Sequence, residues 1–165
     1  MIIRAMEKKD LTQTSQVHKL AFVRQHHSLQ WLERTFSAFP RTLCYVSERD
    51  GKIEGYIIWS QKSGFRPEAV LELEQIAVLP DRQGKGIGED LIFLSLPLVK
   101  QQLAEQNSVL KHIMVTTRAD NHAQKLYRKT LGVEVETTIK DLYSADEVLM
   151  VARHVSVPSH LQVNV

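Results

Sequence analysis

Three glycines and two basic residues occur within seven positions of the chain. Gly84, Gly86 and Gly88 alternate with other residues, and Arg82 and Lys85 lie among them. The run separates a predicted buried strand from a predicted amphipathic helix, and a helix start presents unpaired N–H groups and partial positive charge. Glycines let the backbone approach a phosphate without a Cβ in the way, and basic side chains add charge-assisted contacts. The stretch therefore predicts an anion site; the alternative is a glycine-rich turn with solvated basic residues.

The glycine spacing excludes two common nucleotide-binding motifs. The dinucleotide fingerprint G-x-G-x-x-G does not fit, because the glycines here run G-x-G-x-G. The P-loop does not fit either, since no G-K-[ST] follows a four-residue spacer. The pattern that fits is [Q/R]-x-x-G-x-[G/A] over residues 83–88.

Two carboxylates precede the glycines in the strand predicted over residues 69–78. In an extended strand Glu72, Glu74, Ile76 and Val78 project to one face, so both carboxylates share a side with the residues that lead into the glycines. Either carboxylate could accept a proton through a water molecule. The alternative is that they are solvated or salt-bridged strand residues.

The composition limits the class of protein. The chain has 165 residues, 43% hydrophobic and 24% charged, which predicts one globular domain with a substantial core. Its 21 basic and 19 acidic residues nearly balance, so neither a nucleic acid nor a membrane is expected as a partner. No apolar run reaches the roughly 18 residues that a membrane span requires. Cys44 is the only cysteine, so we expect no disulfide, no metal and a cytoplasmic location.

The apolar periodicities predict a mixed α/β chain. Pro97 is expected to kink the third helix or end it early, Asp10 to cap the first, and residues 156–165 to form a loose tail. Strands are predicted over 1–6, 42–48, 53–60, 69–78, 112–117, 133–139 and 146–155, and helices over 11–21, 29–36, 87–99 and 120–131.

Together with the preceding LELEQIAVLPDR, the glycine pattern closely resembles the coenzyme A binding motif of the GNAT superfamily of acyl-coenzyme A dependent N-acetyltransferases. The resemblance covers most of the chain: IIRAMEKKDL is similar to the family's opening strand and helix, and ADNHAQKLYRKTLGV to its second motif. It implies a single GNAT-like domain over residues 1–165, with a mixed, mostly antiparallel sheet flanked by helices. It also implies acetyl-coenzyme A as co-substrate, and an acceptor site walled by the first two helices.

The resemblance further implies which residues bind the cofactor. In the family the loop and helix start hold the pyrophosphate, and the backbone of the preceding strand pairs with the pantetheine arm. The matching positions are Gln83, Gly84, Lys85, Gly86, Ile87 and Gly88 for the pyrophosphate, and Ile76, Ala77 and Val78 for the arm. Asp120 and Asn121, at the start of the second motif, are also expected to bind the cofactor.

The second motif, N-x-x-A-x-x-L-Y with a glycine four residues later, fits in two registers. One keeps the family's alanine, leucine and Tyr127, places Asp120 with Asn121 beside it at the asparagine position, and puts Gly132 five residues after Tyr127. The other anchors on Asn121 and Gly132 and puts Arg128 at the tyrosine site. We prefer the first, since it also gives the helix an aspartate N-cap.

The resemblance implies an enzyme that moves an acetyl group from acetyl-coenzyme A directly to a primary amine of a small molecule or protein. Tyr127 has the chemistry of its general acid, since a phenol with an ordinary pKa near 10 is protonated at neutral pH. Glu72 matches the glutamate base of some members by its position relative to Gln83, whereas Glu74 lies nearer the expected thioester. Of the two, we favour Glu72 as the base. The alternative is a non-catalytic acyl-coenzyme A sensing module, which needs the loop alone. The final strand and tail could pair across a homodimer.

Overall fold

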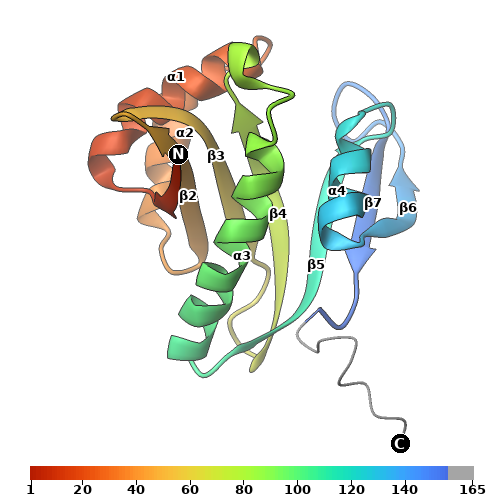
Figure 1. Ribbon diagram of the computed structural model, residues 1–165. Helices are drawn as coiled ribbons and strands as arrows, with labels where there is room; N and C mark the ends of the chain where they lie inside the picture. Colours follow the sequence, from red (N-terminus) through yellow and green to blue (C-terminus); the bar gives the residue numbers. More distant parts are fainter. Residues whose placement is uncertain (156–165) are drawn as a thin grey trace, which may run out of the picture. The chain divides into compact units, whose positions relative to one another are not determined.

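The computed structural model of the chain describes residues 1–155; the predicted tail, 156–165, lies outside the described residues. The strands form a seven-stranded, mostly antiparallel sheet flanked by helices, which confirms the predicted fold (Figure 1). The strand order is β1-β2-β3-β4-β5-β7-β6, with β4 and β5 paired in parallel. No helix within residues 1–155 is both long enough and apolar enough to cross a membrane.

The helices and strands lie close to their predicted positions. The strands are β1 Ile2–Ala5, β2 Thr42–Arg49, β3 Lys52–Gln61, β4 Glu68–Val78, β5 Val109–Arg118, β6 Glu134–Ile139 and β7 Glu147–Ala152. The helices are α1 Leu11–Ala21, α2 Ser28–Ser37, α3 Ile87–Glu105 and α4 Ala123–Leu131, with 3-10 turns η1 Lys8–Asp10 and η2 Pro80–Arg82.

The chain divides into two compact units, and β4 and α3 each contribute residues to both. Unit 1 comprises Met1–Ser60 and Glu74–Val99, and unit 2 comprises Gln61–Leu73 and the described residues from Lys100 onward. Unit 1 therefore contains the end of β4, the glycine run and the start of α3. Unit 2 contains β5, α4, β6 and β7. The single domain over residues 1–165 stays a prediction.

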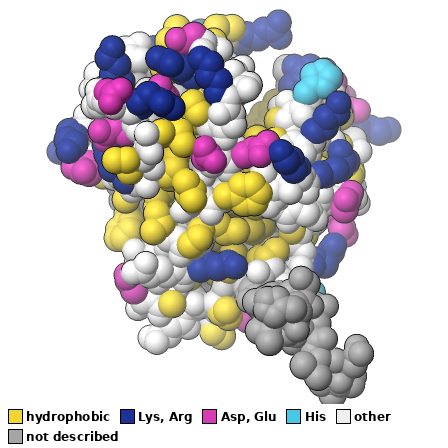
Figure 2. Space-filling model, in the orientation of Figure 1, with side chains coloured by type: hydrophobic (Ala, Val, Ile, Leu, Met, Phe, Trp, Pro, Cys, Tyr) yellow, Lys and Arg dark blue, Asp and Glu magenta, His cyan; other side chains and the backbone are white. Residues whose placement is uncertain are grey.

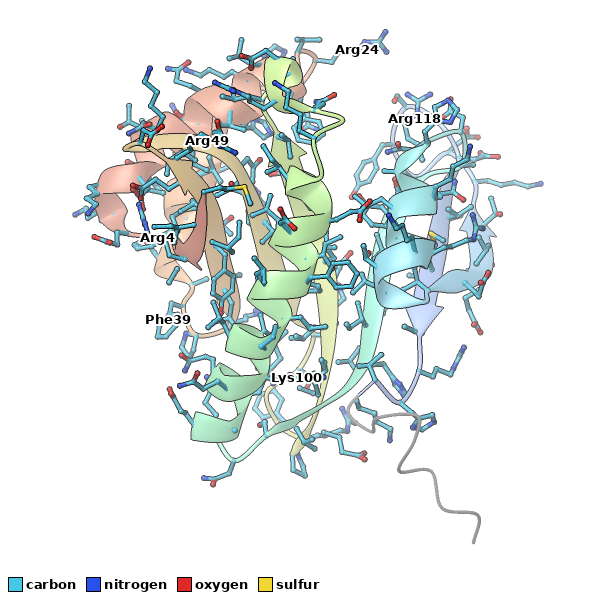
Figure 3. All side chains as sticks on the ribbon, viewed as in Figure 1. Arg4, Arg24, Phe39, Arg49, Lys100 and Arg118 are labelled. Atoms are coloured by element: carbon cyan, nitrogen blue, oxygen red, sulfur yellow. The ribbon has the colours of Figure 1, made fainter. Side chains whose placement is uncertain are left out.

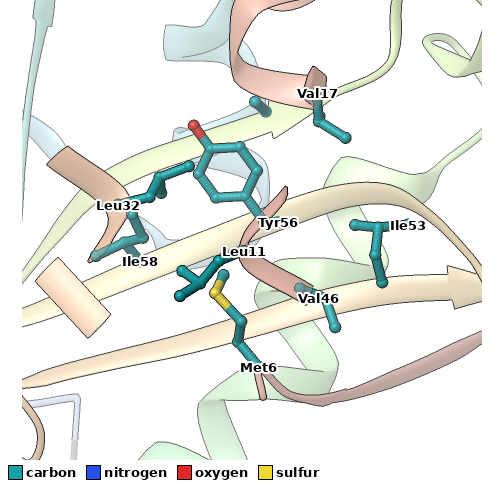
Figure 4. Close-up of a cluster of buried hydrophobic side chains, with 9 residues drawn as sticks. Met6, Leu11, Val17, Leu32, Val46, Ile53, Tyr56 and Ile58 are labelled. Atoms are coloured by element: carbon teal, nitrogen blue, oxygen red, sulfur yellow. The ribbon is translucent and has the colours of Figure 1, made fainter. Parts of the chain in front are cut away.

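In unit 1 an apolar cluster fills the space between strands β2 and β3 and helices α1 and α2 (Figure 4). Val17 of α1, Leu32 of α2 and Val46 of β2 meet around Tyr56 of β3, which is fully buried. The Tyr56 hydroxyl donates to Oε1 of Gln75 in β4 at 2.6 Å, so its one polar group is satisfied. The cluster fixes the sheet face on which α1 and α2 lie.

Helix α3 packs on the opposite face of unit 1, in front of β3 in Figure 1. Trp59 of β3 is fully buried, and its indole Nε1 donates to the hydroxyl of Ser95 in α3 at 2.9 Å. This bond and the buried residues Leu91, Ile92 and Val99 fix α3 against the sheet.

Pro97 does not end α3, which continues to Glu105, so the prediction of an early end is wrong. Proline has no N–H and leaves the carbonyl four residues earlier, that of Phe93, without its helical donor. Phe93 and Pro97 both lie on the exposed side of α3, where water can reach that carbonyl, and Figure 2 shows hydrophobic side chains exposed on this face. The packing of the buried side outweighs one lost hydrogen bond.

Asp10 precedes α1 at the N-cap position, but its carboxylate does not cap the helix. The Arg4 guanidinium donates to both of its oxygens, at 2.7 and 3.0 Å, and the Glu7 N–H donates to Oδ2 at 2.8 Å. Arg4 thereby holds the pKa of Asp10 below its usual range. The carboxylate therefore ties β1 to the start of α1 rather than satisfying a helix N–H.

Gly55 of β3 lies directly against the end of β4. A Cβ at this position would lie 2.8 Å from the Ala77 carbonyl oxygen and 3.3 Å from Cγ2 of Val78. A contact with a backbone oxygen is not relieved by rotating a side chain, so we expect Gly55→Ala to lower the free energy of unfolding by about 1–3 kcal/mol. Gly64→Ala is the matched control, because a Cβ there meets nothing within 4 Å. Equal thermal unfolding midpoints for the two variants would contradict the close approach.

Candidate functional site

The glycine run joins η2 to α3 directly after β4. Nε2 of Gln83 donates to the carbonyl of Val78 at 3.1 Å and ties the loop to the strand end. Gly84 and Gly86 have φ of +72° and +82°, in the left-handed region that favours glycine. A Cβ at either position would meet nothing within 4 Å. The backbone conformation, rather than crowding inside the protein, therefore calls for these two glycines.

Helix α3 begins with amide groups that have no acceptor inside the helix. Its first backbone hydrogen bond runs from the N–H of Asp90 to the carbonyl of Gly86 at 3.0 Å. The N–H groups of Ile87 and Gly88 precede this bond, so no helical carbonyl is available to them. They stand at the positive end of a helix of 19 residues, which is suited to binding a phosphate.

Two basic side chains lie beside the loop. Nζ of Lys85 donates to the carbonyl of Asp81 at 3.1 Å, and Nε of Arg82 lies 3.3 Å from Oε1 of Glu54, a buried carboxylate of β3. These contacts leave a net positive charge beside the loop. The carbonyl that Lys85 contacts is neutral, and the single negative charge of Glu54 is divided between two arginines, Arg82 and Arg49. Loop, helix start and basic residues all belong to unit 1.

The end of β4 does not keep the alternation that the sequence predicts. Three contacts show which face of the sheet Glu74 lies on. Glu74 accepts a hydrogen bond from Ser60 of β3, and Ser60 is paired with Thr42 in the neighbouring strand β2. The Thr42 hydroxyl in turn donates to a carbonyl of α2. Glu74 therefore faces the side covered by α1 and α2. Val78 faces the other side, where its Cγ2 lies beside Gly55 and α3. Residues four apart should share a face, so the alternation is broken between them, as a β-bulge would do.

The two candidate carboxylates have different partners. Glu72 forms an ion pair with Nζ of Lys62, and its side chain is 19% exposed. Glu74 is exposed and accepts from the neutral hydroxyl of Ser60. A carboxylate offers about four lone-pair sites, so one hydroxyl leaves Glu74 able to accept from water or an amine. Of the two, Glu72 is therefore the one that fits the alternative role of a salt-bridged strand residue without a catalytic function.

Tyr127 lies in α4 of unit 2 and is 7% exposed. Burial raises the pKa of its phenol to about 12, so the hydroxyl keeps its proton through neutral and mildly alkaline pH. Within unit 2, the described residues give this hydroxyl no hydrogen-bond partner. A buried protonated phenol fits a proton donor and a packing residue alike.

Asn121, not Asp120, supplies the side-chain oxygen at the start of α4. Oδ1 of Asn121 accepts from the N–H of Ala123 at 2.9 Å. Asp120 instead forms a two-pronged pair with Arg118, labelled in Figure 3, with both distances 3.0 Å, and Arg118 holds the pKa of Asp120 below its usual range. The predicted aspartate N-cap is therefore wrong, and the register of the second motif loses one of its supports. Gly132 ends the helix with φ of +67°, as predicted.

Cys44 lies in β2 and packs against the apolar cluster of unit 1. Burial raises the pKa of its thiol to about 12, so at neutral pH it is not a thiolate nucleophile. Across residues 1–155 there is no group of three or more histidine, cysteine, aspartate or glutamate side chains placed to hold a metal ion.

Comparisons with known proteins show which sequences and solved structures this chain is similar to. The sequence model described as the Acetyltransferase (GNAT) family matches residues 10–133. Comparison with curated proteins gave no match. One similar solved structure is an aminoglycoside 6'-N-acetyltransferase complexed with coenzyme A, with 16% identity, a TM-score of 0.74, and 96% of this chain and 99% of that chain covered. Another is the ribosomal-protein-S18-alanine N-acetyltransferase from Escherichia coli, with 21% identity, a TM-score of 0.70, and coverage of 98% and 99%. At these identities the structures show a shared fold.

Proposed function

The chain belongs to the GNAT acetyltransferase family, and on that basis we propose that it transfers the acetyl group of acetyl-coenzyme A directly to a primary amine. The observation that carries the proposal is the loop of unit 1. Gly84 and Gly86 hold positive φ and lead into the free N–H groups of Ile87 and Gly88. A pyrophosphate would accept from these groups, while the backbone of residues 76–78 would pair with the pantetheine arm.

The proposed reaction needs two proton transfers. As the amine nitrogen bonds to the carbonyl carbon and the carbon–sulfur bond breaks, the amine loses a proton and the thiolate gains one. The sequence favours Glu72 as the base, but we propose Glu74 in its place, acting through water. Glu74 faces α1 and α2 and keeps lone pairs for water, whereas Glu72 is paired with Lys62 and becomes the second candidate. We assign Tyr127 as the acid on the strength of the motif it shares with the family.

Gly86→Val is expected to weaken coenzyme A binding at least about tenfold. The valine side chain would occupy the open space that the pyrophosphate has to enter. Gly51→Val is the matched control, since Gly51 has φ of +76° in the β2–β3 hairpin and a side chain there strains the backbone outside the loop. Isothermal titration calorimetry on folded proteins gives the comparison. Unchanged affinity in Gly86→Val would contradict the loop assignment, and equal losses in both variants would reduce the effect to backbone strain.

An acceptor screen tests the proposed function and identifies the amine. The library should include aminoglycosides and peptides that begin with alanine, because two structural neighbours are named for those acceptors, together with spermine and amino-acid amines. We expect at least one amine to gain an acetyl group by mass spectrometry. A protein that binds coenzyme A but acetylates nothing would instead be a sensing module. We place the protein in the cytoplasm, because its single cysteine suits a reducing compartment.

A further inference from the structure

Glu54 is a carboxylate buried in β3 between two arginines. It is 3% exposed, with Oε2 3.1 Å from Nε of Arg49 and Oε1 3.3 Å from Nε of Arg82. Figure 3 labels Arg49, which is the last residue of β2. A buried charge needs compensation, and here the second of the two compensating groups belongs to the proposed phosphate loop.

The same residue also fixes the backbone that leads into the loop. The carbonyl of Glu54 accepts from the N–H of Leu79 at 2.8 Å, and the carbonyl of Leu79 accepts from the N–H of Arg82 at 2.8 Å. Glu54 therefore holds η2 at its beginning through the backbone and at its end through the side chain.

The contacts of Arg82 with carboxylates are both made at Nε. The partners are Glu54 and, at 3.7 Å, Asp81, whose side chain is 76% exposed. Arg49 alone balances the charge of Glu54, and Asp81 is solvated, so the charge of Arg82 is available beyond the buried pair. A guanidinium whose Nε pairs with a buried carboxylate still has two Nη groups, and their planar fork matches the geometry of phosphate oxygens.

We propose that Glu54 is a positioning residue that orients Arg82, so that the Nη groups of Arg82 bind a phosphate of coenzyme A. The inference rests on the proposed function, because it requires coenzyme A to bind at this loop. A role of Glu54 in folding alone would lower stability without depending on Arg82. A role through Arg82 would act on the affinity for coenzyme A, and only while Arg82 is present.

A double-mutant cycle separates these roles. Coenzyme A affinity is measured by calorimetry for the wild type, Glu54→Gln, Arg82→Gln and the double variant, with Glu48→Gln as control because Glu48 pairs with Arg4 in β1. We expect Arg82→Gln to weaken binding about tenfold, Glu54→Gln severalfold, and Glu54→Gln to add nothing once Arg82 is removed. In turnover, Glu54→Gln should raise KM for acetyl-coenzyme A and leave kcat unchanged.

Other outcomes overturn the inference. If Glu54→Gln weakens binding equally with and without Arg82, or not at all, Glu54 does not act through Arg82. If Glu54→Gln fails to fold, Arg82→Lys decides: lysine keeps the charge but lacks the anchored fork, so affinity should fall as far as in Arg82→Gln, and wild-type affinity would overturn the proposal. A wild type that does not bind coenzyme A would overturn the proposed function together with this inference, whereas binding without coupling overturns the inference alone.

Discussion

Tyr127→Phe is expected to lower turnover about 100-fold while leaving acetyl-coenzyme A affinity close to wild type. Phenylalanine keeps the ring and removes the proton that the departing thiolate would take. Because burial raises the pKa of this phenol to about 12, the wild-type acid should stay protonated up to at least pH 10. Steady-state kinetics with a confirmed acceptor across a pH series gives the measurement.

Tyr45 provides the control for this substitution. It is 5% exposed in β2 of unit 1, and burial raises its pKa to about 12 as well, so Tyr45→Phe removes a hydroxyl from a similar environment outside the proposed machinery. We expect it to stay within about twofold of wild-type turnover, as it removes no catalytic proton. If Tyr127→Phe is equally silent and only Tyr127→Ala has an effect, through stability, then Tyr127 is a packing residue.

Glu74→Gln is expected to lower turnover by about 100-fold, and Glu72→Gln by less than about tenfold. Glutamine has nearly the same shape as glutamate but lacks the carboxylate that would accept the proton. Its amide oxygen can still accept a hydrogen bond from Ser60 at position 74 or from Lys62 at position 72. We expect the larger loss at position 74 because the Glu74 carboxylate accepts only from the neutral hydroxyl of Ser60 and remains available to take a proton. The Glu72 carboxylate is instead paired with the ammonium group of Lys62. Initial rates at saturating acetyl-coenzyme A give the comparison, and the reverse order would assign the base to Glu72.

The elements of the fold were predictable where local chemistry decides them. The β2–β3 hairpin has Asp50 and Gly51 with φ of 51° and 76° at its turn, a pairing that the sequence RDGK indicates. Gly132 closes α4 for the same reason, because a left-handed residue suits a helix end. The glycine loop was predictable too, since Gly84 and Gly86 are dictated by their own backbone conformations.

Features that depend on packing or on a particular side-chain partner were not predictable in this way. The continuation of α3 past Pro97 depends on the buried side of the helix, and the broken alternation between Glu74 and Val78 depends on how β4 meets β3. At the start of α4, Arg118 occupies the carboxylate of Asp120 and leaves the capping role to Asn121. In each case a local preference was outweighed by a partner that local sequence patterns do not identify.

The partners of the two candidate carboxylates, Ser60 and Lys62, were also not predictable from local sequence patterns. Ser60 and Lys62 alternate at the end of β3 and just beyond it, and that spacing of two is the signal that could have placed them on one side of the sheet. It becomes informative only once β3 and β4 are known to be neighbours. The resemblance to a family is the source of the expected cofactor and the proposed reaction, whereas these contacts are what favours Glu74 over Glu72 in the proposal.

The release of free thiol from acetyl-coenzyme A, measured against amine concentration with an acceptor from the screen, tests the central claim most directly. A direct transfer predicts that the rate rises with the amine and saturates, with one thiol released for each acetylated amine. A rate that does not depend on the amine, or thiol released without acetylated product, would contradict it, because the acetyl group would then be passing to water or remaining bound.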